Sequence, residues 1–321
     1  MNVKPLKVPI LLLQTEALSK RLPPQHRLHS IVQQQAKMLR TGHKGEEALE
    51  FPLSFLPDNQ YHIFHNLRIY DGLGYFQIDK LLLTNKFMLI LEVKNIYGTL
   101  AYDNMGQFIR IVEEKEEGFS NPVAQVQLQS IRLRRWLKQF HFPPIPIDTL
   151  VVHTDPRSII KNVHNQDIII KKVVHKENLL SKVEEVSNVY KILCLTDIQM
   201  HELSTLLSSS HHPYKVDILN KYDITKDVLL TGVICPACAA IPMHRIHGKW
   251  QCLKCNCVKK DTHIQALKEY QLMIGDRITN KQAREFLQLN SAYVTKRLLN
   301  QTCVKQIGST SGRRYELGFF S

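Results

Sequence analysis

The sequence contains no apolar run long enough to cross a membrane. Its longest clean apolar runs, near Pro9–Leu13 and Phe87–Val93, fall short of the roughly 20 residues that a membrane-spanning helix needs. The N-terminal segment is basic and has a short apolar run, but it lacks a small-residue cleavage site, so we do not interpret it as a signal peptide. These absences lead us to expect a cytoplasmic protein without a membrane partner.

The sequence also has no internal repeat, and it lacks the low hydrophobic content that is typical of disordered chains. Hydrophobic residues make up 44% of its 321 residues, which indicates an ordinary globular core. This length is enough for two or three domains.

Acidic residues are scarce in the C-terminal third of the chain. From Lys226 to Ser321 there are 15 Lys and Arg against 6 Asp and Glu, whereas the first 225 residues hold 27 against 23. The net charge of +13 is therefore concentrated near the C-terminus. Such a bias indicates a polyanionic partner, with nucleic acid as the first candidate. A solvated basic surface without a partner is the alternative.

The first half of the chain alternates between predicted strands and helices. Alternating or continuous apolar residues predict strands, and apolar residues at helical spacing predict helices. The stretch "TGHKG" is expected to form a loop. The predicted elements are a short strand near the N-terminus, a polar helix "HSIVQQQAKMLR", a helical "EEALEFPLSFL", strands "YHIFHNLRI", Tyr75–Leu83, Phe87–Lys94 and "IDTLVVHT", and a helix "NPVAQVQLQSIRLRRWLKQF".

Two acids and a lysine interrupt the apolar stretch "FQIDKLLLTNKFMLILEVKNIYG". If "TNKF" forms a hairpin turn centred on its Asn-Lys pair, Asp79 lies opposite Glu92 and Gln77 lies opposite Lys94. Side chains two apart on a strand share a face, so this register gathers all four residues on one face of the sheet.

Directly opposed carboxylates repel each other, because their Cβ atoms are only about 5 Å apart. Mg²⁺ removes this repulsion, since it takes one or two carboxylates together with substrate phosphate and water. A lysine beside them can offset the charge that develops during attack on a phosphate. The cluster therefore suits metal-assisted phosphodiester hydrolysis. The alternative is an ion pair between Glu92 and Lys94 at the sheet edge, with Asp79 solvated.

Three stretches, "GEEALEFPLSFL", "FQIDKLLLTNKFMLILEVKNIYGTL" and "NPVAQVQLQSIRLRRWL", resemble the nuclease-related domain, or NERD, over residues from about 38 to 160. That family is similar to PD-(D/E)xK nucleases, which include archaeal Holliday-junction resolvases and restriction endonucleases. The resemblance implies an α/β, restriction-endonuclease-like fold with a mixed sheet flanked by helices. It also implies cleavage of nucleic acid that depends on Mg²⁺ (or Mn²⁺), with no small-molecule cofactor. Ile78 stands where the motif name has proline, which is not a ligand.

The resemblance also assigns roles to five residues by position. Asp79 and Glu92 would be the metal ligands, and Lys94 would position the attacking water or stabilise charge. Glu46 would be the helix acid near the metal, and Gln125 a polar helix residue at the edge of the site. The alternative for Glu46 is a first-turn acid favoured by the helix dipole, and the alternative for Gln125 is an exposed helix residue.

Four cysteines form the pattern C-x₂-C-x₁₃-C-x₂-C at Cys235, Cys238, Cys252 and Cys255. Two such pairs can meet as four thiolates around Zn²⁺, which predicts a zinc ribbon. A site closed by four thiolates is structural rather than catalytic. A disulfide pairing is the alternative, and Cys257 lies outside the pattern.

The pattern of the last sixty residues predicts a helix-turn-helix followed by two strands around a Gly/Ser-rich tip. This arrangement resembles a winged-helix domain. Thr279 stands three residues before Gln282, a capping-box pattern that starts the first of these two helices. The alternative is a small helical module that binds protein or docks on the nuclease-like domain. The residues expected to contact DNA are Tyr293, Lys296, Arg297 and Asn300 on the second helix, and Arg313 and Arg314 on the wing.

The predicted domains are a NERD nuclease-like domain (1–185), a helical linker (186–225), a zinc ribbon (226–262) and a winged-helix-like DNA-binding domain (263–321). Together they predict a DNA-processing protein with a metal-dependent nuclease site. A catalytically inactive DNA-binding adaptor or regulator is the main alternative, and an RNA-processing enzyme is a third. The sequence does not predict an oligomeric state.

Overall fold

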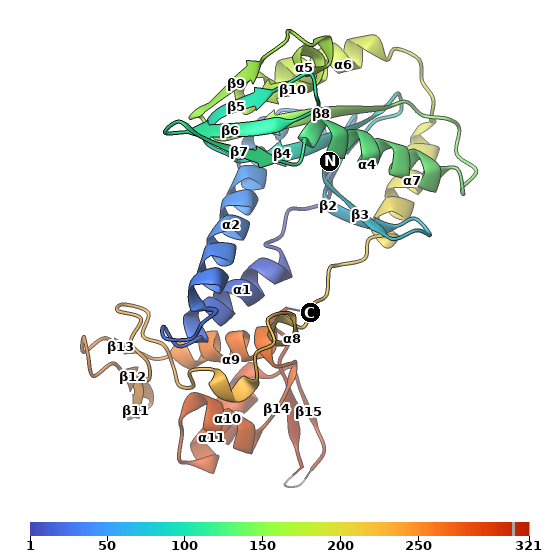
Figure 1. The fold of residues 1–321 in the computed structure, drawn as a ribbon. Coiled ribbons are helices and arrows are strands. Elements are labelled where there is room, and N and C mark those ends of the chain that lie inside the picture. The colour runs from blue at the N-terminus through green and yellow to red at the C-terminus, as the bar shows by residue number, and fades with distance from the viewer. Residues whose placement is uncertain (310–311, 321) are drawn as a thin grey trace. The chain divides into compact units, whose positions relative to one another are not determined.

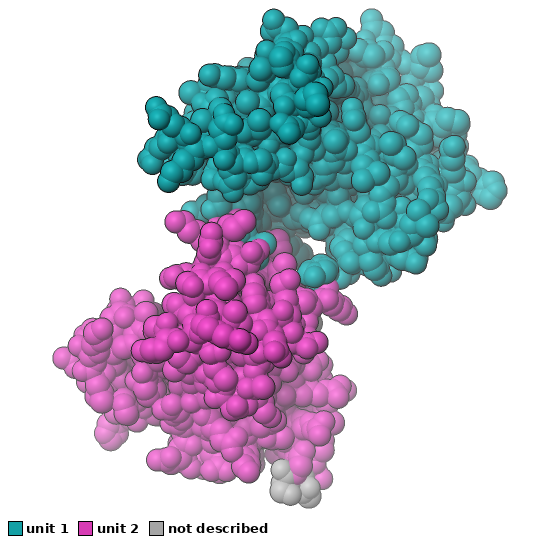
Figure 2. Space-filling model, viewed as in Figure 1, with its two compact units in different colours: residues 1–8, 39–214 teal, residues 9–38, 215–321 magenta. Residues whose placement is uncertain are grey.

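The computed structural model describes residues 1–309 and 312–320, and the chain divides into two compact units (Figures 1 and 2). Unit 1 comprises Met1–Val8 and Leu39–Tyr214, and unit 2 comprises Pro9–Met38 and Lys215–Ser321. Helix α2 (His29–Glu47) contributes residues to both units. Residues 9–38 thus group with the C-terminal part of the chain, although the sequence placed them in the first domain. The domain boundaries at residues 185, 225 and 262 remain predictions.

Unit 1 has a mixed α/β fold, as the sequence predicted (Figure 1). Its helices, besides the end of α2, are α3 (Glu50–Leu53), α4 (Pro122–Leu137), α5 (Asp167–Lys172), a 3-10 turn (Lys176–Asn178), α6 (Leu179–Val189) and α7 (Asp197–Ser209). Its strands are β1 (Asn2–Lys4), β2 (His62–Tyr70), β3 (Tyr75–Leu83), β4 (Met88–Lys94), β5 (Gly98–Tyr102), β6 (Phe108–Val112), β7 (Lys115–Phe119), β8 (Ile147–His153), β9 (Ser158–Asn162) and β10 (Val173–His175).

The main sheet of unit 1 has six strands in the order β1-β2-β3-β4-β8-β10. Strands β2, β3 and β4 are antiparallel neighbours, whereas β4, β8 and β10 run parallel. A second sheet has the order β7-β6-β5-β9. The parallel pair β4–β8 is connected through α4, as a crossover between parallel strands requires.

Both faces of the main sheet are covered. Ile90 and Val151 point into a core that includes side chains of α4 and α7 and of the second sheet. Leu89 and Leu150, one residue away on the same strands, point into the opposite core with α3 and α6. Burial on both faces explains why β4 and β8 are nearly continuous apolar runs.

The hairpin register predicted from the sequence is confirmed. Leu83 pairs with Met88 and Lys80 pairs with Leu91, which fits a turn centred on the Asn-Lys pair of "TNKF". Thr84 closes the turn, because its backbone N–H donates to the Phe87 carbonyl at 3.0 Å.

The expected loop at "TGHKG" was wrong, because helix α2 continues through these residues to Glu47. Glycine is required at position 45 by close packing and not by a turn of the backbone. A Cβ on Gly45 would lie 2.5 Å from the Cβ of Asn95 and 2.9 Å from Oγ1 of Thr154. Glycine thus lets the helix approach the segments that follow β4 and β8. This approach brings Glu46 to the same edge of the sheet.

Unit 2 consists of helices and two small sheets. Its helices, besides the start of α2, are α1 (Ile10–Arg21), α8 (Ile218–Lys221), a 3-10 turn (Lys226–Val228), α9 (Thr262–Met273), α10 (Asn280–Leu287) and α11 (Ala292–Thr302). Its strands are β11 (His244–Ile246), β12 (Lys249–Gln251), β13 (Val258–Lys259), β14 (Arg277–Thr279), β15 (Lys305–Ile307) and β16 (Arg314–Glu316), in the sheet orders β11-β12-β13 and β14-β16-β15.

The core of unit 2 joins α1 to α9, α10 and α11. A buried ion pair, 2.7 Å between Arg21 Nε and Glu269 Oε2, ties α1 to α9, and the Arg21 guanidinium lies over the ring of Phe286. The predicted capping box is present, since Thr279 and Gln282 exchange hydrogen bonds at the start of α10. In the described part of the chain, no helix has both the length and the apolar content needed to cross a bilayer.

Candidate active site and metal cluster

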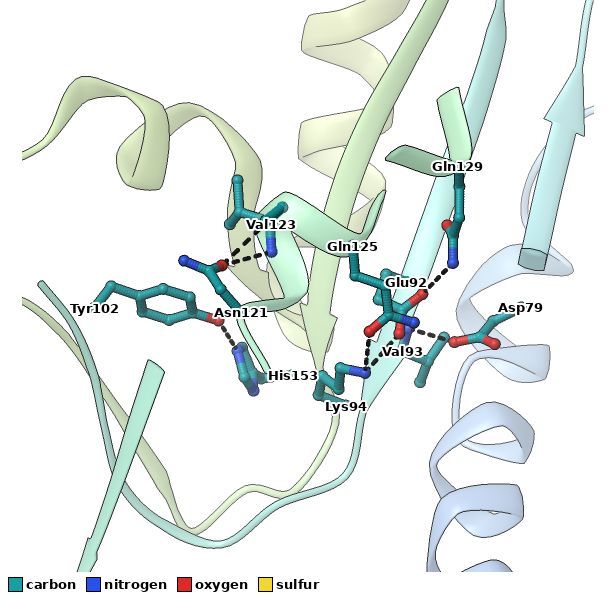
Figure 3. Close-up of polar contacts among 11 residues, drawn as sticks. Asp79, Glu92, Val93, Lys94, Tyr102, Asn121, Val123, Gln125, Gln129 and His153 are labelled. Atoms are coloured by element: carbon teal, nitrogen blue, oxygen red, sulfur yellow. Dashed lines mark hydrogen bonds and ion pairs between the residues drawn. The ribbon is translucent and has the colours of Figure 1, made fainter. Parts of the chain in front are cut away.

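The predicted catalytic residues come from four elements of unit 1, and Figure 3 shows Asp79, Glu92, Lys94 and Gln125 close together at one edge of the main sheet. Strand β3 carries Asp79, strand β4 carries Glu92 and Lys94, helix α4 carries Gln125, and helix α2 carries Glu46. The start of α4 is set locally, because Asn121 caps the helix through a 2.9 Å hydrogen bond from Val123 N and Pro122 occupies the first turn.

Glu92 and Lys94 form a close ion pair at the end of β4. Lys94 Nζ lies 2.6 Å from Glu92 Oε1, and it also donates to Gln125 Oε1 at 3.1 Å (Figure 3). Glu92 is 1% exposed, so this carboxylate needs partners to be stable in the interior. Its second oxygen, Oε2, accepts a hydrogen bond of 2.8 Å from Gln129 Nε2.

Asp79 lies one position beyond the last backbone pair between β3 and β4. Instead of pairing with Glu92 through the backbone, Asp79 accepts a 3.0 Å hydrogen bond from Val93 N through its own Oδ2 (Figure 3). Burial, together with the charges of Glu92 and Glu46, raises the pKa of Asp79 well above its usual value.

The predicted pairing of Gln77 with Lys94 was wrong. Gln77 pairs with Arg68 on β2, and Lys94 pairs with His153 on β8. The ladder between β3 and β4 ends at Lys80 and Leu91, so it does not reach Gln77 or Lys94. Beyond that point β4 remains paired with β8 alone.

Glu46 is held by a residue that the sequence did not single out. Asn66, which has a positive φ of 49°, donates to Glu46 Oε2 at 2.7 Å. Burial raises the pKa of Glu46, and the nearby charge of Glu92 adds to this effect. Glu46 lies in the last turn of α2 rather than in a first turn, so the helix dipole does not favour it as the alternative required.

The carboxylates provide the donor chemistry of a divalent-cation site. Burial raises the pKa of Asp79 and of Glu46, and the charge of Glu92 adds to the rise in both. Hard oxygen donors of this kind suit Mg²⁺ or Mn²⁺, which complete their shell with water and substrate oxygens. The three acids are less tightly gathered than the cysteines of unit 2. Among residues 1–309 and 312–320, only those cysteines bring three or more ligand atoms within 4.8 Å of one another.

Gln129 is the main site residue that the sequence analysis missed. It follows Gln125 by four residues, so both amides lie on the same face of α4 and reach the neighbouring residues Glu92 and Lys94. This i, i+4 pair of glutamines was the available signal. Gln129 is 7% exposed, and its Oε1 has no hydrogen-bond partner among the described residues.

The four predicted cysteines of unit 2 converge. All four Sγ atoms lie within 4.8 Å of one another, and Cys235–Cys255 and Cys238–Cys252 are each separated by 3.6 Å. Sulfurs bound tetrahedrally to zinc at about 2.3 Å would be roughly 3.8 Å apart, so the spacing suits that ion. Burial acts to raise the pKa of Cys235, but backbone N–H groups of Cys238 and Ala237 lower it to about 6.

The two cysteine pairs sit in matching turns. Ala239 N donates to Cys235 O, and Asn256 N donates to Cys252 O, each at 2.9 Å. Ala239 and Asn256 also have nearly equal positive φ angles, 58° and 56°. In the second turn Cys257 takes the place that Ala240 has in the first, which agrees with its exclusion from the ligand pattern.

The predicted second helix of the helix-turn-helix is α11. Ser291 caps this helix, and Leu298 and Leu299 are buried on its inner side. The predicted contact residues Tyr293, Lys296, Arg297 and Asn300 are all exposed.

The two predicted wing arginines differ in their surroundings. Arg314 is exposed on β16, whereas Arg313 donates to the carbonyls of Gly308 and Ser309 at 3.3 and 3.0 Å. Arg313 therefore holds the chain near its own turn, and Arg314 is the more available cation.

Comparison with known proteins finds a related family over the region that carries this site. Residues 41–154 match the model of a family described as "Nuclease-related domain", which lies inside the region of resemblance predicted from the sequence. An uncharacterized protein of Bacillus anthracis is 25% identical over 166 residues, covering 50% of this chain and 74% of that protein. No solved structure matches the chain. The matched region contains Glu46, Asp79, Glu92, Lys94 and Gln125.

Proposed function

We propose that unit 1 is a metal-dependent nuclease whose cation is held by Asp79 and Glu92. The observation that carries this proposal is the buried Glu92, bound by Lys94 at 2.6 Å and lying beside Asp79, within a region that matches the nuclease-related domain. The neighbouring carboxylates of Asp79 and Glu92 support a cation at this place, and Mg²⁺ or Mn²⁺ suits their oxygen donors.

A bound cation supplies positive charge at the scissile phosphate and lowers the pKa of a water molecule. Side chains of unit 1 stabilise charge, orient the metal ligand and hold protons. Lys94 offsets the negative charge that develops on the phosphate, and Gln125 orients its ammonium group. Gln129 fixes the Glu92 carboxylate, and Glu46, half-buried with a raised pKa, is suited to hold a proton or orient a water.

For unit 2 we propose a structural zinc ion and binding of duplex DNA. The closed set of four thiolates supports zinc in a structural role. Helices α10 and α11 followed by β15 and β16 support a winged-helix-like module, and its cations support contact with phosphates. A cytoplasmic location remains a prediction of the sequence.

The second candidate function is a DNA-binding adaptor with an inactive nuclease fold. One observation favours it: both oxygens of Glu92 accept hydrogen bonds from side chains of the protein, Lys94 and Gln129. An ion pair of this kind can satisfy a buried carboxylate by itself.

A cleavage assay with matched variants separates the two functions. Full-length protein is incubated with Mg²⁺ or Mn²⁺ and with duplex, branched and single-stranded DNA and RNA. Glu92→Ala should abolish cleavage, Lys94→Ala should remove most of it, and Glu46→Gln should have a smaller effect. Glu184→Ala, at an exposed position of α6, is the control and should cleave like wild type. Equal absence of cleavage in wild type and Glu92→Ala, with DNA binding intact, would establish the adaptor.

A further inference from the structure

Three tyrosines are exposed together at one end of unit 1. Tyr70 and Tyr75 are cross-strand partners at the end of the β2–β3 hairpin, with ring centroids 5.1 Å apart. Tyr214 comes from the segment that follows α7. The exposed fractions of the three are 50%, 45% and 45%, so core packing does not account for them. We call Tyr70, Tyr75, Tyr214 and the adjacent Arg68 the hairpin platform.

Arg68 gives the hairpin platform a positive charge. Its guanidinium carbon lies 3.6 Å from the centroid of Tyr75 and 5.3 Å from that of Tyr214. Within residues 1–309 and 312–320 the structure records no ion pair for Arg68. The acid in the hairpin turn, Asp71, is already bound through both oxygens by Arg132 at 2.8 and 2.9 Å. The Arg68 guanidinium donates to the His212 carbonyl at 3.2 Å, a neutral acceptor that leaves its positive charge uncompensated.

The hairpin platform is held in place by the backbone. Arg68 N donates to His211 Nδ1 at 3.1 Å, and His212 N donates to Arg68 O at 2.9 Å. These bonds fix the segment that leads to Tyr214. Burial, with smaller contributions from the positive charges of Lys4, His212 and Arg68, lowers the pKa of His211 to about 4. His211 is therefore neutral at neutral pH and can accept the hydrogen bond from Arg68 N.

The hairpin platform is continuous with the proposed active site along β3. Tyr75 precedes Asp79 by four residues, which is about 13 Å in an extended strand. Exposed Gln77 lies between them and shares the face of Tyr75. Its amide donates to Asn66, the residue that binds Glu46. A strand of nucleic acid lying over this row would meet aromatic rings first and carboxylates next.

We propose that the hairpin platform binds unpaired bases of single-stranded nucleic acid beside the active site. The proposal rests on the proposed function of unit 1, because it specifies the substrate of that site. Exposed tyrosine rings offer stacking surfaces that any base can use, and the charge of Arg68, whose guanidinium already lies over Tyr75, attracts the phosphates. A duplex hides the faces of its bases in its own stack, so it would not gain from these rings.

Photo-crosslinking locates such contacts directly. Full-length protein is mixed with single-stranded DNA that contains 5-iodouracil, in EDTA to prevent cleavage, and the crosslinked peptides are identified by mass spectrometry. Crosslinks are expected at Tyr70, Tyr75 or Tyr214, and they should persist when excess unlabelled duplex occupies unit 2. Crosslinks confined to unit 2, or their removal by duplex, would overturn the proposal.

Binding measurements on tyrosine variants test the same proposal. Tyr75→Leu should weaken binding of single-stranded DNA about tenfold at fixed salt, with duplex binding unchanged, and Tyr75→Trp should restore it. Tyr97→Leu is the control, because Tyr97 is as exposed as Tyr75 and also lies near two arginines, Arg110 and Arg157. Unlike Arg68, each of these arginines is paired with a carboxylate. Thermal unfolding confirms that each variant is folded. Equal losses in both leucine variants would contradict the proposal.

This test is independent of cleavage. Crosslinking is measured in EDTA, where no cleavage takes place. If wild type cleaves nothing but the crosslinks appear, the nuclease proposal fails and the hairpin platform stands. If wild type cleaves but no crosslinks form at the hairpin platform, the platform proposal fails and the nuclease proposal stands.

Discussion

Gln129 Nε2 donates to Glu92 Oε2 at 2.8 Å, and this contact joins helix α4 to the buried acid of the proposed active site. Among the described residues, no backbone N–H donates to the Glu92 carboxylate, so Gln129 and Lys94 together determine its orientation. A group that orients a metal ligand commonly changes metal affinity when it is removed.

Gln129→Leu should therefore weaken binding of Mn²⁺ by roughly tenfold or more, and reduce cleavage in parallel. Isothermal titration calorimetry without nucleic acid measures the affinity. Gln127→Leu changes an exposed position of the same helix and is the matched control. Unchanged Mn²⁺ affinity in Gln129→Leu would show that this hydrogen bond serves the fold alone.

Cys235→Ser should release zinc and lower the stability of unit 2, because metal binding and folding are coupled in closed thiolate sites. Metal analysis should find about one zinc per chain in wild type, as expected for four thiolate ligands. Cys257→Ser should retain the zinc, since Cys257 takes the place of Ala240 rather than that of a ligand. Urea unfolding should show unit 1 unaffected in both variants. Loss of zinc from Cys257→Ser instead would mean that the ligand set is misassigned.

Arg314→Ala should weaken binding to all duplex sequences alike and reduce the salt dependence of the affinity by about one counterion. Arg297→Ala on α11 should instead change sequence preference if this side chain reads bases. Fluorescence anisotropy over a salt series, with several duplexes, measures both effects. Lys191→Ala, an exposed lysine of unit 1, is the control for loss of one charge. A salt slope that is identical in Arg314→Ala and Lys191→Ala would argue against the wing contact.

His153 should make the stability of unit 1 dependent on pH. The ring is fully buried against Tyr102, whose hydroxyl lies 2.8 Å from Nε2, and burial lowers its pKa to about 3. The unfolded chain takes up a proton below about pH 6.5, whereas the folded chain stays neutral until about pH 3. Stability is therefore present above pH 6.5 and is lost as the pH falls through this window.

His153→Gln should keep an acceptor for Tyr102 and remove the titration. Between pH 6.5 and 4 its free energy of unfolding should depend less on pH than that of wild type, by up to about 1.4 kcal/mol per pH unit. Urea unfolding followed by Trp136 fluorescence, with Trp250→Phe in both proteins, measures this slope. His201→Gln, at an exposed position, is the control. Parallel slopes for wild type and His153→Gln would mean that His153 is not kept neutral by the fold.

The sequence by itself determined the features whose geometry is local. The turn in "TNKF" and the strand period of two fixed the register of β3 and β4, because each residue added to a strand reverses the side-chain direction. The short spacings within each cysteine pair similarly predicted the cluster, since two tight turns suffice to present four sulfurs. The capping box of α10 depends on residues only three positions apart.

Only the tertiary structure decided what depends on close approach between distant segments. Gly45 looked like a loop residue, yet it lies against Asn95 and Thr154, and this contact extends α2 and places Glu46. Gln129 reaches Glu92 across the helix–sheet interface, and the hairpin platform forms only because residues 211–214 lie along β2. Such contacts depend on the volumes and directions of side chains that the folded core brings together, and residue spacing along the chain carries little information about them.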